Sequence, residues 1–186
     1  MTGVASFPEL QVKRLQFLKE AVPHISKVAL LWTSINTGEF NAATSAADQL
    51  GVQLLPLEIE APTDFEGAFR AATDERVDSL ITSSGNVFSG SLNQIVGFAT
   101  AQRLPAMYYR TEYVDAGGLM AYGINYDAFF KRSAVYVDKI LRGARPADLP
   151  IEQPTEFDFA INLKTAQALG ISIPRDLLLQ ATKLVQ

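Results

Sequence analysis

The chain has 186 residues, of which 48% are hydrophobic, 19% charged and 10% aromatic, and its formal net charge is −4 at pH 7. This composition supplies enough apolar material for a sizeable core and differs clearly from that of a disordered chain. An acidic balance with no basic run longer than a pair argues against nucleic acid or an anionic membrane as a partner. Because the chain has no cysteine, a disulfide framework, a thiolate nucleophile and a cysteine-ligated metal are excluded.

The first two thirds of the chain alternate between strand and helix patterns. Residues 27–32 are continuously apolar, which is typical of a strand covered by helices on both faces. Pro56 lacks a backbone donor, so its strand is expected near an edge of the sheet. The repeated strand-helix unit predicts an α/β fold, with a parallel sheet and helices on both faces. The predicted strands are residues 27–32, 53–59, 77–82, 105–109 and 119–122.

Capping signals predict where several helices begin and end. Ser6 with Glu9 indicates a capping box at the start of the first helix, and Thr63 with Glu66 indicates a second one. Gly51 is expected to end the helix that follows the first strand, in a left-handed conformation.

The alternation breaks at residues 116–123, where a glycine pair, a short apolar strand and a closing glycine follow one another. A long helix over residues 126–142 comes next and is predicted to bury Phe130, Ala134, Val137 and Leu141. After it come a proline-rich connection at 145–154, a strand at 157–161, a helix at 163–169 and a last helix after Pro174. We interpret residues 116–123 as the path out of one αβ lobe and into part of another, beside a ligand cleft.

Residues that carry catalysis are sparse in this sequence. His24 is the only histidine, so neither a Ser-His-Asp triad nor a multi-histidine metal site can be assembled. The carboxylates are scattered over predicted helix ends, and the loop at residues 83–86 lacks the glycine and lysine pattern of a phosphate site. We therefore expect no catalytic residue, no cofactor and no metal.

The ends of the predicted strands carry a set of uncharged polar and aromatic side chains. Because ligands of open α/β sheets bind outside the carboxyl ends of the strands, these side chains are candidates for one wall of a pocket. Such groups suit a small neutral or zwitterionic molecule with an apolar or aromatic body. Some of them also occur simply as turn, cap or packing residues, and that alternative stays open. The candidate ligand-binding residues are Trp32, Ser34, Asn36, Ser83, Ser84, Asn86, Tyr122 and Asn125, with Tyr108 and Tyr109 beside them.

Longer motifs, found in one order along the whole chain, carry a family resemblance. They are residues 117–123 (Gly-Gly-Leu-Met-Ala-Tyr-Gly), 136–150, 152–155, 162–166 and 169–170, with 2–4, 13–15, 18–20 and 27–32 nearer the N-terminus. Together they resemble the ABC transporter substrate-binding proteins of the tryptophan/tyrosine uptake type.

The resemblance implies a type I periplasmic-binding-protein fold, in which two αβ lobes close over a small ligand and the closed form meets a membrane permease. It also implies that the ligand is not chemically changed, that an aromatic amino acid is a candidate ligand, and that the protein is periplasmic or lipid-anchored. Residues 1–6 lack the basic and apolar segments of a signal peptide, so the product as given is expected to stay cytoplasmic.

In the same family, residues 2–4 would fall in the first crossover between lobes, which suggests an N-terminally truncated form. Residues 1–125 are then the ligand-binding lobe with the start of the crossover. Residues 126–186 are return segments that would pack on a missing N-terminal lobe, and self-association through the exposed face is expected.

Two other functions stay open on the sequence. A ligand-sensing domain of a regulator or receptor would have the same fold. An enzyme is the third alternative, although one histidine, no cysteine and no nucleophile elbow count against it.

Overall fold

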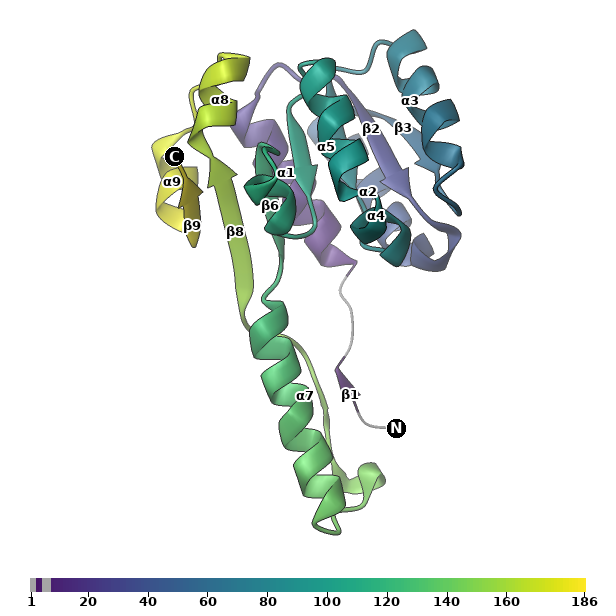
Figure 1. The fold of residues 1–186 in the computed structure, drawn as a ribbon, viewed down its shortest axis with the longest axis vertical. Coiled ribbons are helices and arrows are strands. Elements are labelled where there is room, and N and C mark those ends of the chain that lie inside the picture. The colour runs from purple at the N-terminus through teal and green to yellow at the C-terminus, as the bar shows by residue number, and fades with distance from the viewer. Residues whose placement is uncertain (1–2, 5–7) are drawn as a thin grey trace.

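The computed structural model describes residues 3–4 and 8–186 and places a seven-stranded sheet at the centre of the molecule (Figure 1). The strand order is β3-β2-β4-β5-β6-β8-β9, and every neighbouring pair is parallel except β6 with β8. The strands are β2 (Lys27–Trp32), β3 (Gln53–Glu58), β4 (Ser79–Thr82), β5 (Ala106–Tyr108), β6 (Met120–Ile124), β8 (Phe157–Asn162) and β9 (Lys183–Val185). The carboxyl ends of β2, β4, β5 and β6 therefore lie along one edge of the sheet.

Helices cover both faces of this sheet, which confirms the predicted fold class. Successive residues of β2 point to opposite faces, so Leu30 joins the core beneath α1 and α2, whereas Leu31 joins the core beneath α3 and α5. The helices next to the sheet are α1 (Glu9–Ala21), α2 (Thr37–Leu50), α3 (Asp64–Asp74) and α5 (Leu92–Ala101). Three short elements lie in the loops at the carboxyl ends of the strands: η1 (Ser34–Asn36), α4 (Asn86–Gly90) and α6 (Glu112–Asp115).

Local sequence signals gave mixed results. The strand that contains Pro56 is the edge strand β3, as predicted, and Gly51 ends α2 with a φ of 64°. The capping box at Thr63 is wrong, because the Thr63 side chain makes no cap hydrogen bond. Asp64 Oδ2 instead accepts from the backbone N–H groups of the two residues 60 and 61, at 2.9 and 2.8 Å. Ser6, the predicted cap of α1, lies outside the described residues.

Helix α7 (Tyr126–Leu141) projects away from the sheet, and the chain returns beside it through η2 (Pro146–Asp148) and β7 (Ile151–Glu152) (Figure 1). Strand β7 pairs in parallel with β1 (Gly3–Val4), so two segments distant in sequence meet beside α7. Tyr136 is buried against this return, and its hydroxyl donates to the Pro150 carbonyl at 2.9 Å.

The predicted burial of the apolar face of α7 is wrong. Phe130 is 63% exposed, Val137 55% and Leu141 81%, and Ala134 is exposed as well. The reason is that α7 packs against β1 and the returning segment on one side, whereas these four side chains lie largely outside that contact. The helix therefore presents an apolar surface.

The C-terminal segments return to the main sheet. Strand β8 pairs antiparallel with β6, and the unpredicted strand β9 extends the sheet beyond β8. Phe159, Ile161 and Leu177 join the same core as α1, together with α8 (Leu163–Leu169) and α9 (Arg175–Gln180). Of the predicted return segments, 126–186, residues 126–156 form the projection, whereas β8 and β9 join the main sheet and α8 and α9 pack against its core.

Within the described part of the chain, no helix combines the length and apolarity that crossing a membrane requires.

Candidate ligand-binding site

Candidate residues from two strand ends meet at one edge of the sheet. Trp32 closes β2, and Ser83 and Ser84 follow β4, which pairs with β2 in a register that sets Leu31 opposite Thr82. The Asn36 side-chain amide donates to the Ser84 carbonyl and lies 3.4 Å from the Ser84 hydroxyl. The predicted proximity of these two loops is therefore present in the structure.

A buried carboxylate beneath the edge holds Ser84 in place. Glu39 Oε2, in the first turn of α2, accepts from the Ser84 backbone N–H at 3.0 Å, and Glu39 Oε1 accepts from the Ser84 hydroxyl. Arg14 of α1 donates to Glu39 Oε2 at 3.3 Å. Burial lowers the pKa of the Arg14 guanidinium, and the neighbouring Glu39 charge opposes that shift. Neither Arg14 nor Glu39 was among the sequence candidates.

The candidates differ in what they leave free for a ligand. The backbone N–H, hydroxyl and carbonyl of Ser84 are all bonded within the protein, and Ser83 is fully buried. Ser34 and Asn86 are exposed. Asn36 is half-buried, and its side-chain oxygen accepts no hydrogen bond from the described residues. Side-chain groups of these three residues are thus the polar groups that the two loops offer.

Trp32 is half-buried at the end of β2 and packs against a neighbouring ring. Its indole is half-buried and stacks on Phe40, with ring centroids 4.4 Å apart. Its indole N–H is buried and has no hydrogen-bond partner among the described residues. The half-buried ring at the strand end suits a ligand that carries an aromatic ring, whereas the buried N–H is not accessible to a ligand in this conformation.

Tyr122 and Asn125 have partners within the protein, which fits the alternative that such residues serve packing and capping. The Tyr122 ring packs edge-on against Phe17 at 5.2 Å and also meets Phe157 and Phe159. Asn125 caps α7, because its Oδ1 accepts from the Ala128 N–H at 2.8 Å while its Nδ2 donates to Asp158 at 2.9 Å. Tyr108 is buried and stacked on Tyr113 at 4.6 Å, and burial raises the pKa of its hydroxyl.

A small hollow of about 220 Å³ lies where β5 and β6 end, and it has charged groups that the sequence did not single out. The Arg110 guanidinium lies 4.6 Å from the centroid of the Tyr126 ring, within the range of a cation–π contact. Arg110 also pairs with Glu112, whose hydrogen bond raises the Arg110 pKa. The hollow is lined by Tyr109, Arg110, Thr111, Glu112, Gly123, Ile124, Asn125, Tyr126, Asp127, Phe130 and Asp158.

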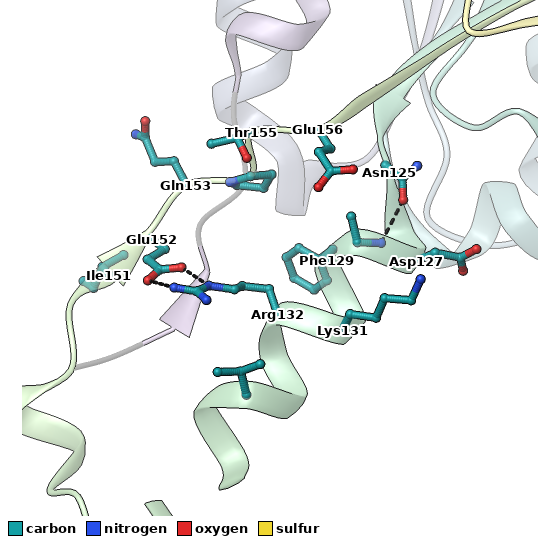
Figure 2. Close-up of a pocket in the computed structure, with 13 residues that line it drawn as sticks. Asn125, Asp127, Phe129, Lys131, Arg132, Ile151, Glu152, Gln153, Thr155 and Glu156 are labelled. Atoms are coloured by element: carbon teal, nitrogen blue, oxygen red, sulfur yellow. Dashed lines mark hydrogen bonds and ion pairs between the residues drawn. The ribbon is translucent and has the colours of Figure 1, made fainter. Parts of the chain in front are cut away.

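A much larger hollow of about 1040 Å³ lies between the first turns of α7 and residues 151–156 (Figure 2). Arg132 of α7 reaches across it and pairs through two nitrogens with the Glu152 carboxylate, as Figure 2 shows. These bonds from Arg132 lower the pKa of Glu152 to about 2. Asn125 is the one sequence candidate that lines this hollow. The hollow is therefore separate from the edge that contains Trp32 and Ser84.

Among the described residues, no three side chains of histidine, cysteine, aspartate or glutamate come together in an arrangement that could hold a metal ion.

Comparison with solved structures defines the class of fold. A conserved domain protein from Vibrio cholerae superposes with a TM-score of 0.89 at 22% identity, over 98% of this chain and 62% of its own. An ABC domain in complex with L-Trp from Streptococcus pneumoniae also gives 0.89 at 22% identity, over 99% of this chain and 64% of its own. These similarities assign the chain to the periplasmic-binding-protein-like fold.

The family model described as ABC transporter substrate binding protein matches residues 1–185, and the chain belongs to this family. A curated relative, the tyrosine-binding protein of Clostridioides difficile, is 21% identical over 165 residues, which are 86% of this chain and 47% of the relative. The chain thus spans about half the length of that relative and less than two thirds of the two solved chains.

Proposed function

We propose that the chain is the ligand-binding lobe of the solute receptor of an ABC importer, and that it binds an aromatic amino acid at the carboxyl ends of β2, β4, β5 and β6. The observation that carries the proposal is the edge itself, where Trp32 offers a half-buried ring and Asn36 and Asn86 offer side-chain amides. Membership of a family of ABC transporter substrate-binding proteins supports the proposal.

An amino acid matches the chemistry of the two adjoining parts of the edge. The ligand ring stacks on Trp32 in this proposal, and its zwitterionic end lies toward the hollow that contains Arg110 and Asp127. Tyrosine and L-Trp in the names of the two relatives support this class of ligand. No bond of the ligand is made or broken, so the protein is not an enzyme in this proposal.

A second lobe completes the cleft in the proposed mechanism. Ligand contacts made by both lobes exist only in the closed form, so the ligand shifts the hinge equilibrium toward closure. The closed form is then recognised by a membrane permease, in a periplasmic or lipid-anchored setting. The exposed apolar surface of α7, with Phe130 and Leu141, is where this chain meets another folded body, either a second lobe or a second copy.

A thermal-shift screen of the amino acids tests the proposal. We expect L-tryptophan or L-tyrosine to raise the melting temperature of a chimera that joins this chain to the N-terminal lobe of the Streptococcus relative. The 186-residue chain alone should give a much smaller shift, because ligand stabilisation grows with affinity.

The controls are alanine and glutamate at the same concentrations, which should produce no shift. The aromatic amino-acid proposal fails if no amino acid shifts the chimera. Equal shifts in the chimera and in the single chain would show that one lobe suffices and that closure is not needed.

A further inference from the structure

A buried ion pair lies under the candidate edge and joins elements that are far apart in sequence. The Arg14 and Glu39 side chains are 3% and 6% exposed, and their closest atoms are 3.3 Å apart. Arg14 Nη1 also donates to Gln11 at 2.6 Å. The three residues come from α1 and α2, which pack side by side on the same face of the sheet.

Both members of the ion pair also form hydrogen bonds to the edge of the sheet, each to a different part of it. Glu39 accepts both the backbone N–H and the hydroxyl of Ser84, in the loop after β4. Arg14 Nε donates to the Tyr122 carbonyl of β6 at 2.8 Å. The loop after β4 and strand β6 are therefore connected through two charged side chains, although β5 lies between their strands in the sheet.

Stability alone does not account for such a pair. Buried ion pairs are generally no more stabilising than well-packed apolar residues of the same size, because both charges must leave water. The pair instead fixes the relative positions of its partners, because the planar guanidinium donates hydrogen bonds in several set directions. The Ser84 backbone is hydrogen-bonded on both sides: its N–H donates to Glu39, and its carbonyl accepts from the Asn36 amide.

Strand β6 is also the strand that leads through Asn125 into the projecting helix α7 (Figure 1). The contact of Arg14 with Tyr122 thus lies two residues before the end of β6, close to where the projection begins. A shift of β6 would be transmitted through Arg14 and Glu39 to the loop that contains Ser84 and Asn86.

We propose that Arg14 and Glu39 are positioning residues that fix the loop at residues 83–86 relative to β6. The proposal rests on the proposed function for its consequence, since this loop is part of the edge that binds ligand. Neither residue contacts the ligand in this view; they act through Ser84.

Amide hydrogen exchange tests the positioning role without any ligand. In the 186-residue chain, Glu39→Leu, which removes both acceptor oxygens, should increase exchange of the Ser84 N–H at least tenfold more than exchange of core amides such as that of Leu30. The matched control is Ile95→Val, which alters a buried side chain on the opposite face of the sheet and should leave the Ser84 rate unchanged relative to the core.

A second variant covers the case in which Glu39→Leu does not fold. Arg14→Met combined with Glu39→Leu replaces the pair by apolar side chains, which commonly preserves folding. The double variant should keep a melting temperature near that of the wild type and still release the Ser84 amide. If the Ser84 amide stays as protected as the core in a folded variant, the positioning role is wrong.

A ligand readout then links the pair to binding. In the chimera, the double variant should bind L-tyrosine about tenfold more weakly than the wild-type chimera while melting at the same temperature. Unchanged affinity with a released Ser84 amide would overturn the link to binding. If the wild-type chimera binds no amino acid, the proposed function fails, and the exchange experiment still decides the positioning role.

Discussion

Replacing Glu39 by leucine should lower the free energy of unfolding by about 3–5 kcal/mol, because it leaves the Arg14 guanidinium buried without its counter-charge. Arg14 is 3% exposed, and among the described residues it retains Gln11 and the Tyr122 carbonyl as hydrogen-bond partners in this variant. The Ser84 N–H and hydroxyl also lose their acceptor. Urea unfolding followed by circular dichroism measures the change.

The matched control is Glu66→Leu, which removes an ion pair from the surface of α3. Glu66 and Arg70 lie 3.1 Å apart, and their side chains are 83% and 70% exposed. Exposed pairs of this kind contribute about 0–1 kcal/mol, so this variant should unfold almost like the wild type. Comparable losses for Glu39→Leu and Glu66→Leu would mean that the Arg14 pair is not buried as described.

Gly123→Ala should also be strongly destabilising, by about 3 kcal/mol or more, because it forces β6 away from the backbone of the residue that follows β5. A Cβ atom at residue 123 would lie 2.0 Å from the Tyr109 carbonyl oxygen, and this neighbour is backbone that cannot rotate away. Gly123 is paired with Asp158 on its other side, so moving β6 away from residue 109 would disturb its pairing with β8. Thermal and urea unfolding both measure the loss.

Gly67→Ala is the control for this substitution. Gly67 lies inside α3, and a Cβ atom there would meet nothing within 4 Å. Alanine is favoured over glycine in a helix interior by about 0.5–1 kcal/mol, so this variant should be as stable as the wild type or slightly more stable. A similar response of the two glycine variants would contradict the close approach of β6 to residue 109.

Parts of the fold that depend on local patterns could be predicted from the sequence. The continuous apolar run of β2 marked a strand covered on both faces, and its predicted bounds, residues 27–32, are those observed. Pro56 indicated the edge strand, because a proline has no backbone N–H with which to bond a neighbouring strand. Strand β9 was missed, since three residues ending a chain carry too little periodicity to indicate a strand.

Side-chain partners across the fold could not be predicted in the same way. Glu39 looks like an ordinary acidic residue in the first turn of a helix, and its contact with Ser84 spans 45 positions. Arg110 and Tyr126 follow different strands, so their contact depends on the order of β5 and β6 in the sheet. Such contacts arise from topology, which a single sequence does not contain.

The site was predicted in part for the same reason. Asn36 and Ser84 were expected at the same edge because carboxyl ends of parallel strands align, and they are hydrogen-bonded there. Tyr122 lies two residues before the end of β6 and points to the face of α1, where aromatic partners surround it. The strand period of two, counted from Met120 in the α1 core, favours this packing position. A role of Tyr122 in binding stays a prediction.

The apolar surface of α7 illustrates a different limit. Helical periodicity identified Phe130, Val137 and Leu141 as one face, but periodicity does not say what covers that face. In the described residues these side chains are exposed, as they would be on a helix that docks against another folded body. The proposed second lobe or second copy is such a body.

Binding of L-tyrosine at the carboxyl ends of the strands can be followed by the fluorescence of Trp32, because it is the only tryptophan in the chain and lies at the proposed binding edge. The measurement is a titration with L-tyrosine, with excitation at the red edge of the indole band, where tyrosine does not absorb. It uses a chimera in which any tryptophan of the added lobe is replaced by phenylalanine. We expect a saturable change in Trp32 emission, weakened by Asn36→Ala. Calorimetric binding of L-tyrosine with unchanged Trp32 emission would show that the ligand does not bind beside Trp32.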